Sequence, residues 1–302
     1  MKSLLVLLGP TAVGKTDLAI DLARRLHTDI ISADSRQIYR GIPIGTAAPT
    51  PEQQALVRHH FVQTLPLDAY YSAAMYEQDV LNLLSAPTWT GDTALMAGGS
   101  MLYIHAVCHG MDNIPTIRDD IRSLLHNRLQ TEGLDVLYAQ LTRLDPQYAS
   151  TCDPKNPRRV LHALEVCLQS GQPFSAFRTQ QPAKRPFRIV KIGLMRSREH
   201  LFARINGRVD QMMADGLLDE ARALLPGRHL NALNTVGYKE LFRVLDSQWP
   251  LSMAVERIKK NTRVYAKKQM TWFSRDDDIT WINLDTTSTA DALRQITDML
   301  GG

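Results

Sequence analysis

The chain has 302 residues, of which 44% are hydrophobic and 22% are charged, and its formal net charge is +4. These values are typical of a soluble globular protein with one large domain or two smaller ones, and no apolar run approaches the roughly 20 residues of a membrane span. The amino end shows no signal-peptide cleavage pattern, and the three cysteines, Cys108, Cys152 and Cys167, lack metal-ligand spacing. We therefore expect a cytoplasmic protein with no membrane contact, and the positive charge mildly favours a polyanionic partner.

The first predicted elements surround a glycine-rich loop. An apolar strand over Leu4–Leu8 leads into the sequence GPTAVGKT, and a helix over Thr16–Leu26 follows. This is the G-x-x-x-x-G-K-[ST] pattern in a strand–loop–helix setting, where backbone N–H groups, a helix N-terminus and a lysine converge on phosphate. We expect a polyphosphate to bind the loop residues Gly9, Pro10, Thr11, Ala12, Val13, Gly14, Lys15 and Thr16. The Thr16 hydroxyl is a candidate ligand for a divalent cation. A glycine turn without a ligand is the alternative.

Two further strands are predicted over Asp29–Ala33 and Ala94–Ala97, and each ends in polar or glycine-rich residues. Because the carboxyl ends of the strands form the binding crevice of an open α/β sheet, we expect Asp34 and Ser100 on the same rim as the loop. Asp34 is a candidate general base or metal ligand, with capping of its own turn as the alternative. No acidic residue follows Ala97, where an ATP-hydrolysing enzyme of this kind would carry one, so ATP hydrolysis is disfavoured.

Strand patterns disappear between Asp119 and Ser170. Two apolar helical stripes replace them, the first ending at Gly133 and the second starting at Asn156 and ending before Gly171. The stripes consist of Ile121, Leu124, Leu125 and Leu129, and of Leu161, Leu164 and Leu168. We therefore predict an all-helical insertion over residues 116–184, which interrupts an α/β core formed by residues 1–115 and 185–302.

A Pro-rich and basic stretch, Gln180–Arg188, leads back to a strand over Ile189–Leu194, and a final strand is predicted over Ile279–Leu284. Between these strands we predict a long amphipathic helix, a helix after Gly237 and a basic helix from Met253. The apolar face of the amphipathic helix consists of Leu201, Ile205, Val209 and Met212. The fold class is therefore α/β, with a P-loop NTPase-like core of a mostly parallel sheet flanked by helices.

Basic residues gather at three places in the second half of the chain. Arg204 and Arg208 are four residues apart on the amphipathic helix and are candidate diphosphate ligands, although such residues usually face solvent. The stretch Arg257–Arg275 carries seven basic residues and no acidic one, and this density favours a nucleic-acid contact over a solvated face. Its helical face consists of Lys260, Arg263 and Lys267, and its aromatic residues Tyr265, Trp272 and Phe273 either stack on bases or pack inside. The third place, Arg158, Arg159 and His162, suggests a second contact with the same ligand.

These residues leave three classes of function open. A small-molecule kinase would explain the loop but not the basic helix. A nucleic-acid motor would need the acidic residue that is missing after Ala97. A transferase that holds a diphosphate leaving group in the loop and modifies RNA would explain both features.

Six blocks of the sequence resemble, in order, the bacterial tRNA dimethylallyltransferases. The blocks are GPTAVGKT, ISADSRQIYRGIPIGTA, GGSMLYIHAV, DPKNPRRVLHALEV, TVGYKE and TRVYAKKQMTW. The resemblance implies transfer of a dimethylallyl group from dimethylallyl diphosphate to N6 of adenosine 37 in tRNA, beside the anticodon, with Mg²⁺ as the cofactor. The closest enzymatic alternative is an adenylate isopentenyltransferase that uses free adenine nucleotides. We expect a monomer.

The resemblance also implies roles for individual residues. Thr11–Thr16 would hold the diphosphate, Asp34 would be the general base, and Ser100 would contact the acceptor where the family usually has threonine. The implied tRNA contacts are Asp34, Ser35, Arg36, Gln37, Ser100, Arg122, Arg158, Arg159, Val160, Leu161, His162, Asn234, Thr235, Val236, Gly237, Tyr238, Lys239, Arg263, Lys267, Lys268, Gln269, Met270, Thr271, Trp272, Phe273 and Ser274. Two departures are Ala48, where the family usually has lysine, and a one-residue shift of the arginine that follows the last block, here Arg275.

Overall fold

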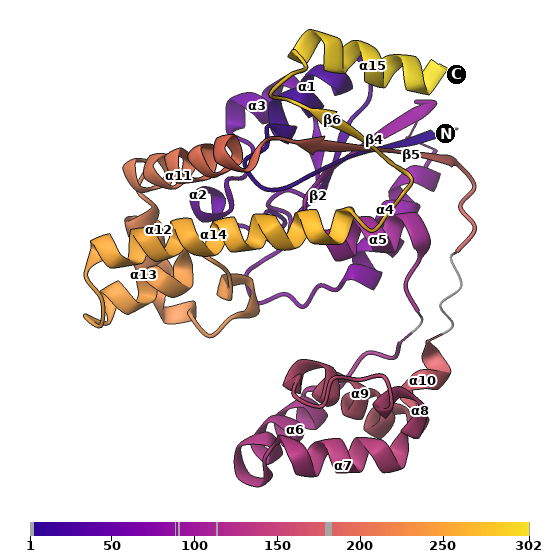
Figure 1. The fold of residues 1–302 in the computed structure, drawn as a ribbon, viewed down its shortest axis with the longest axis vertical. Coiled ribbons are helices and arrows are strands. Elements are labelled where there is room, and N and C mark those ends of the chain that lie inside the picture. Colours follow the sequence, from indigo (N-terminus) through magenta and orange to yellow (C-terminus); the bar gives the residue numbers. More distant parts are fainter. Residues whose placement is uncertain (1–2, 88, 90, 113, 179–182, 302) are drawn as a thin grey trace. The chain divides into compact units, whose positions relative to one another are not determined.

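A computed structural model describes residues 3–87, 89, 91–112, 114–178 and 183–301 (Figure 1). The chain forms two compact units, one made of Met1–His109 with Lys184–Gly302 and the other of Gly110–Ala183. The insertion therefore begins at residue 110, six residues before the predicted start at 116. Part of the predicted Gln180–Arg188 stretch, Gln180 to Pro182, lies outside the described residues.

The first unit is built on a parallel sheet with the strand order β3-β2-β4-β1-β5-β6, in the part of the chain that the structure describes. The strands are β1 (Ser3–Leu8), β2 (Ile30–Ala33), β3 (His59–His60), β4 (Thr93–Gly98), β5 (Arg188–Met195) and β6 (Ile279–Asn283). In the register of the central strands, Leu8 at the end of β1 lies opposite Gly98 on one side and Gly193 on the other. All of these pairs are parallel, so the carboxyl ends of the strands share one edge.

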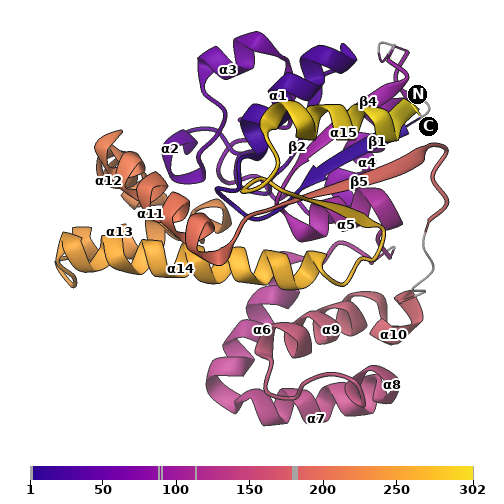
Figure 2. The same ribbon diagram turned by 45° about the horizontal axis from the view of Figure 1, so that its top comes forward.

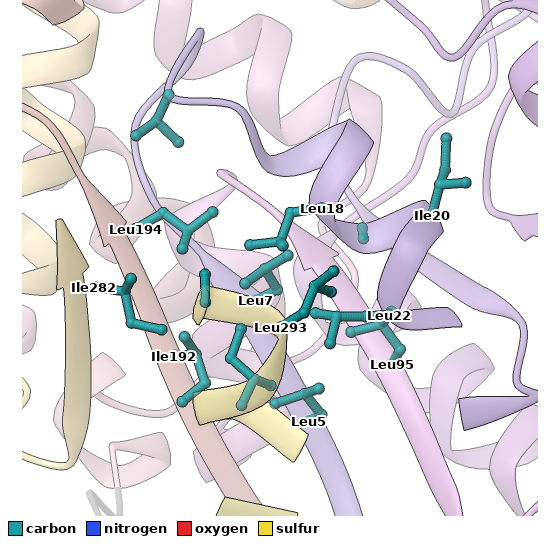
Figure 3. Packing of buried hydrophobic residues seen from close by; sticks show 14 of the residues in the cluster. Leu5, Leu7, Leu18, Ile20, Leu22, Leu95, Ile192, Leu194, Ile282 and Leu293 are labelled. Carbon is teal, nitrogen blue, oxygen red and sulfur yellow. The ribbon is translucent and has the colours of Figure 1, made fainter. Parts of the chain in front are cut away.

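Alternate residues of the central strand pack against opposite layers of helices. Leu5 and Leu7 join a core with the helices α1 (Lys15–Leu26) and α15 (Thr289–Gly301), as Figure 3 shows. Leu4 and Val6 join a second core with α4 (Ala73–Ser85) and α5 (Met101–His109) on the other face. The central strand is therefore apolar on both faces, as expected for a sheet covered by helices on each side.

Further helices extend the first unit beyond the sheet. They are α2 (Pro43–Thr46), α3 (Pro51–Leu56), α11 (Arg198–Ala214), α12 (Leu217–Leu224), α13 (Tyr238–Leu245) and α14 (Leu251–Phe273), with 3₁₀ turns over Leu225–Gly227 and Asn231–Leu233. The long helices α11 and α14 run side by side in both views (Figures 1 and 2). Arg263 of α14 donates a hydrogen bond to Asn206 of α11, at 2.6 Å.

The second unit contains helices and no strand in its described residues. Its helices are α6 (Asp119–Glu132), α7 (Leu134–Leu144), α8 (Pro146–Ala149), α9 (Pro157–Ser170) and α10 (Phe174–Phe177). The predicted caps of α9 are confirmed: the Asn156 side chain accepts from the Arg159 N–H, and Gly171 ends the helix with φ 70°. The predicted stripes are partly wrong, because Leu124 is 52% and Leu168 38% exposed.

Arg185 links the two segments at which the chain leaves the first unit, near His109, and returns to it, near Lys184. Its guanidinium donates to the backbone oxygens of Ala106 and Val107, both at 2.8 Å, and pairs with Glu77 at 2.5 Å. The last carbonyls of a helix have no partner within the helix, so this arginine satisfies the end of α5.

The five predicted strands and the predicted helix after the phosphate loop are confirmed to within about two residues at each end. The basic helix begins at Leu251 and not at Met253. The two-residue edge strand β3, which pairs with Ile30 and Ile31 of β2, is not predicted from the sequence.

Candidate active site

The phosphate loop follows β1 and is held in shape by its own backbone and by two arginines. Positive φ angles occur at Gly9 (151°), Ala12 (64°) and Gly14 (115°). A Cβ at Gly9 would lie 2.7 Å from the Leu194 oxygen, so only glycine fits there. Arg196 donates to the Val13 oxygen at 3.0 Å, and Arg204 donates to the Ala12 oxygen at 2.8 Å. These bonds satisfy two backbone carbonyls of the loop and leave its N–H groups available to bind an anion.

Lys15 is folded back onto the loop. Its Nζ donates to the backbone oxygens of Gly9 at 3.0 Å and of Pro10 at 2.8 Å. Burial and the positive charge of Arg208 lower the pKa of Lys15 to about 7, against a smaller opposing effect of Asp34. The site therefore carries an ammonium group whose charge an incoming anion would stabilise strongly.

Arg208 reaches the loop from α11. It donates to the Thr11 hydroxyl at 3.2 Å and to the Ala47 oxygen at 3.4 Å. Burial lowers the pKa of Arg208 from its usual value, with Asp34 acting in the opposite direction. Arg204 and Arg208 thus lie at the loop together, as their spacing of four residues on one helix predicts.

The ends of β2 and β4 meet beside the loop. The Asp34 Oδ1 accepts from the backbone N–H groups of Arg36 at 2.9 Å and Gln37 at 3.3 Å, which closes the turn after β2. Among the described residues, no hydrogen-bond donor is found on Oδ2 of Asp34, so this oxygen is open to a ligand. Both uses weighed for Asp34, a turn cap and a reactive carboxylate, are therefore compatible.

Ser100 supports this turn. It is 7% exposed, and its Oγ accepts from the Ser35 N–H at 2.8 Å and donates to the Ser35 hydroxyl at 3.2 Å. A direct contact with an acceptor would require Ser35 to release the hydroxyl. In this structure Ser100 therefore stabilises the turn that carries Asp34 through its two hydrogen bonds with Ser35.

A single cavity of about 530 Å³ joins these groups. Its charged lining residues are the cations Lys15, Arg204 and Arg208 and the acids Asp17 and Asp34. It also includes Thr16, the loop residues Thr11, Ala12 and Gly14, and two residues of α14 that lie one turn apart, Tyr265 and Gln269. The cavity therefore brings the predicted phosphate loop, both arginines and Asp34 to one place.

Two residues of α14 close one wall of the cavity. Tyr265 is 38% exposed as a whole residue, but it also lines the cavity, and burial there raises the pKa of its phenol. Gln269 is 1% exposed, and its side chain accepts from the Thr11 N–H at 2.9 Å and donates to the Gly99 oxygen at 2.8 Å. Gln269 is one of the predicted RNA contacts. The structure corrects this, because the side chain is buried between two backbone groups.

Besides Ser100 and Gln269, four side chains predicted as RNA contacts are buried. Val160 and Leu161 belong to the core of the second unit, and Tyr238 and Phe273 to cores of the first. Because these four side chains are buried, any contact of these residues with RNA would have to be made by the backbone. The exposed members of the same segments are Arg158, Arg159, His162, Asn234, Lys239, Lys267, Lys268, Thr271, Trp272 and Ser274.

Other predicted contacts have partners inside the protein. Arg36 donates to the Asn231 oxygen at 2.6 Å, which brings the loop after β2 next to the segment that contains Asn234. Arg263 lies 5.8 Å from the Phe202 ring centre in addition to its bond with Asn206. In the second unit, Arg122 pairs with Asp119 at 3.6 Å, and His162 lies 3.5 Å from Glu165.

A phosphate loop at the end of the central strand of a parallel sheet, facing clustered cations, defines a P-loop α/β protein whose cavity is suited to a phosphate-bearing ligand. The chain belongs to the IPP transferase family, whose model matches residues 37–276. That match begins after the phosphate loop.

Similar proteins extend this result. The tRNA dimethylallyltransferase 1 of Phocaeicola vulgatus is 56% identical over 283 residues, which cover 94% of each chain. The tRNA isopentenylpyrophosphate transferase of Bacillus halodurans has a similar solved structure, with a TM-score of 0.73, 35% identity and coverage of 100% of this chain and 96% of that one. A eukaryotic dimethylallyltransferase acting on tRNA gives a TM-score of 0.85 at 25% identity, with coverage of 100% and 80%. No helix in the described part of the chain is long and apolar enough to cross a membrane.

Proposed function

We propose that this protein transfers a dimethylallyl group from dimethylallyl diphosphate to N6 of adenosine 37 in tRNA. The products are N6-(dimethylallyl)adenosine and diphosphate. One observation carries the proposal: a single cavity holds three cations around a phosphate loop and, on its rim, a carboxylate with an open oxygen. Relatives named for this reaction, at 56% and 55% identity, support it.

The cavity supplies what the reaction requires. The N6 amine of adenine is a weak nucleophile because its lone pair is delocalised into the ring, so the allylic carbon must be strongly activated. Charge that develops on that carbon is shared over the allyl system, while the leaving diphosphate gains negative charge. Lys15, Arg204 and Arg208 stabilise that charge, and Oδ2 of Asp34 accepts the N6 proton.

Mg²⁺ is part of the proposal as the cofactor, and the residues fit it. Thr16 is exposed at the cavity, with Asp17 beside it. Mg²⁺ commonly keeps several waters and binds through one or two protein oxygens plus substrate phosphates, so it needs no preformed cage. Among the described residues no cluster of three His, Cys, Asp or Glu side chains offers such a cage. When bound, the ion would neutralise charge on the diphosphate.

The tRNA is proposed to contact exposed residues of the matching sequence blocks in both units. Arg158, Arg159 and His162 project from the helix α9, and Lys267, Lys268 and Trp272 from the helix α14. The acceptor base has to leave its stack to reach the cavity, which a single-stranded anticodon loop allows at lower cost than a duplex. The proposal includes a monomeric enzyme in the cytoplasm.

The test is to incubate the protein with dimethylallyl diphosphate, Mg²⁺ and unmodified tRNA, and to analyse nucleosides by mass spectrometry. We expect a prenylated adenosine and the release of one diphosphate for each adenosine that is modified. Asp34→Asn keeps the oxygen that closes the turn but removes the base, and a general base contributes about 10²–10⁴-fold to the rate. Turnover with AMP or ATP and none with tRNA would instead identify an adenylate isopentenyltransferase.

A further inference from the structure

The Gln269 side chain is a buried bridge between the phosphate loop and the end of β4. Its Oε1 accepts from the Thr11 N–H at 2.9 Å and its Nε2 donates to the Gly99 oxygen at 2.8 Å. The amide therefore offers an acceptor to an N–H group and a donor to a carbonyl. If the amide were flipped, its NH₂ group would face the Thr11 N–H and its oxygen would face the Gly99 oxygen, so neither hydrogen bond could form.

The Gln269 amide has room because residue 99 is a glycine. A Cβ added at Gly99 would lie 2.4 Å from Nε2 of Gln269 and 3.3 Å from the Gly9 oxygen. Gly99 and Gln269 are thus complementary, although 170 residues separate them in the chain. With the amide in place, Thr11 is held at its backbone by α14 and at its hydroxyl by Arg208 of α11.

The helix that supplies Gln269 is also the basic helix. α14 spans 23 residues, and Lys267, Lys268, Thr271 and Trp272, which flank Gln269 in sequence, are exposed. A straight helix moves and fluctuates as a unit, so a ligand that restrains its exposed residues also restrains the buried amide between them. The restraint on α14 then reaches Thr11 through the Gln269 side chain alone, because this side chain bonds the Thr11 N–H directly.

We propose that Gln269 is a positioning residue through which contact of RNA with α14 raises the affinity of the phosphate loop for diphosphate. The inference rests on the proposed function for the identity of the two ligands. The bridge orients the Thr11 segment of the loop, and ordering of α14 by RNA lowers the entropy that the loop loses when diphosphate binds. Coupling of this kind is reciprocal and typically amounts to about 5–150-fold.

The experiment measures binding of inorganic diphosphate to the full chain by calorimetry, with and without an anticodon stem-loop RNA. For the wild type we expect RNA to tighten diphosphate binding by about fivefold or more. Gln269→Met keeps a similar length without the amide. We expect it to bind diphosphate more weakly, to lose the gain from RNA, and to bind RNA as the wild type does. The KM for dimethylallyl diphosphate should rise more than kcat falls.

Two further variants keep the test decisive if Gln269→Met folds poorly. Gly99→Ala leaves Gln269 in the chain but pushes the amide away, and Gln269→Glu keeps the acceptor for Thr11 while placing a second acceptor against the Gly99 oxygen. Both should reproduce the loss of coupling. Gln211→Leu removes an exposed glutamine of α11 that bonds only Asp215 among the described residues, and it should behave as the wild type.

The inference is overturned if a folded variant keeps wild-type diphosphate affinity and the full gain from RNA, or if only RNA affinity falls. Failure of the proposed function gives a different result. In that case the wild type forms no prenylated adenosine, whatever the variants do in the binding assay.

Discussion

Arg208 and Thr11 form a hydrogen bond of 3.2 Å that joins the middle of α11 to the phosphate loop. Because Arg208 also lines the cavity, it can both shape the loop and attract the ligand. Hydrogen bonds to charged groups contribute about 1.5–3 kcal/mol, so Arg208→Ala should weaken diphosphate binding by roughly 10–150-fold. Arg198→Ala removes an exposed arginine at the start of the same helix and is the matched control. Equal affinities for the two variants, measured by calorimetry, would rule out the contact.

Lys15 should make diphosphate binding depend on pH. Its pKa of about 7 means that the free protein loses the ammonium charge as pH rises through 7, while a bound anion favours the charged form. Affinity should therefore fall by about tenfold per pH unit between pH 7.5 and 9, with proton uptake on binding. Calorimetry with EDTA, in buffers of different ionisation enthalpy, measures both quantities. Lys15→Arg keeps its charge over this range, so a fall of the same size in that variant would contradict the assignment.

The exposed lysines of α14 should set the salt dependence of RNA binding. Lys267→Ala with Lys268→Ala should reduce the slope of log K against log salt concentration by about 0.7–0.9 for each RNA phosphate that is no longer neutralised. Lys259→Ala removes a charge from the same helix, but Lys259 pairs with Asp210 at 2.8 Å and is expected not to contact RNA. Filter binding between 50 and 200 mM salt gives the slopes. If both variants change the slope equally, the effect is one of overall charge.

Asp285 should make the stability of the first unit sensitive to acid. Its carboxylate accepts from the Ser197 N–H at 2.6 Å and from Arg196 at 2.9 Å, and these bonds lower its pKa below the usual 3.8. The folded state therefore prefers the ionised form. The resulting stability is complete well above pH 3.8 and is lost as pH falls towards the folded pKa. Thermal unfolding should show that Asp285→Asn is less stable than the wild type at pH 7 and that the difference narrows below pH 4. The exposed Asp298→Asn should show no such difference at either pH.

Most of the secondary structure that was predicted correctly could be read from local sequence patterns. Leu4–Leu8, the loop and the helix after it lie within one run of the sequence, and their periodicity and glycines determine the local structure. The same holds for the capped helix α9, which begins after Asn156 and ends at Gly171. By contrast, β3 has only two residues and is a strand only because β2 lies beside it.

The tethers of the phosphate loop could not be predicted in this way. Gln269 is 258 residues from Thr11, and Arg196 is 183 residues from Val13. Only the tertiary structure brings such pairs together. A match between a whole sequence block and a family also does not separate the exposed residues of the block from the buried ones. For this reason Phe273 was predicted to contact RNA along with its exposed neighbour Trp272.

Arg185 has a consequence for how the chain is assembled. Its bonds to the end of α5 mean that the first unit closes its own backbone at the point where the second unit begins and ends. The core thus does not depend on the helical unit to hold those two segments together. We therefore expect the sheet of the first unit to tolerate changes in the length of the helical unit, as long as the bonds of Arg185 are kept.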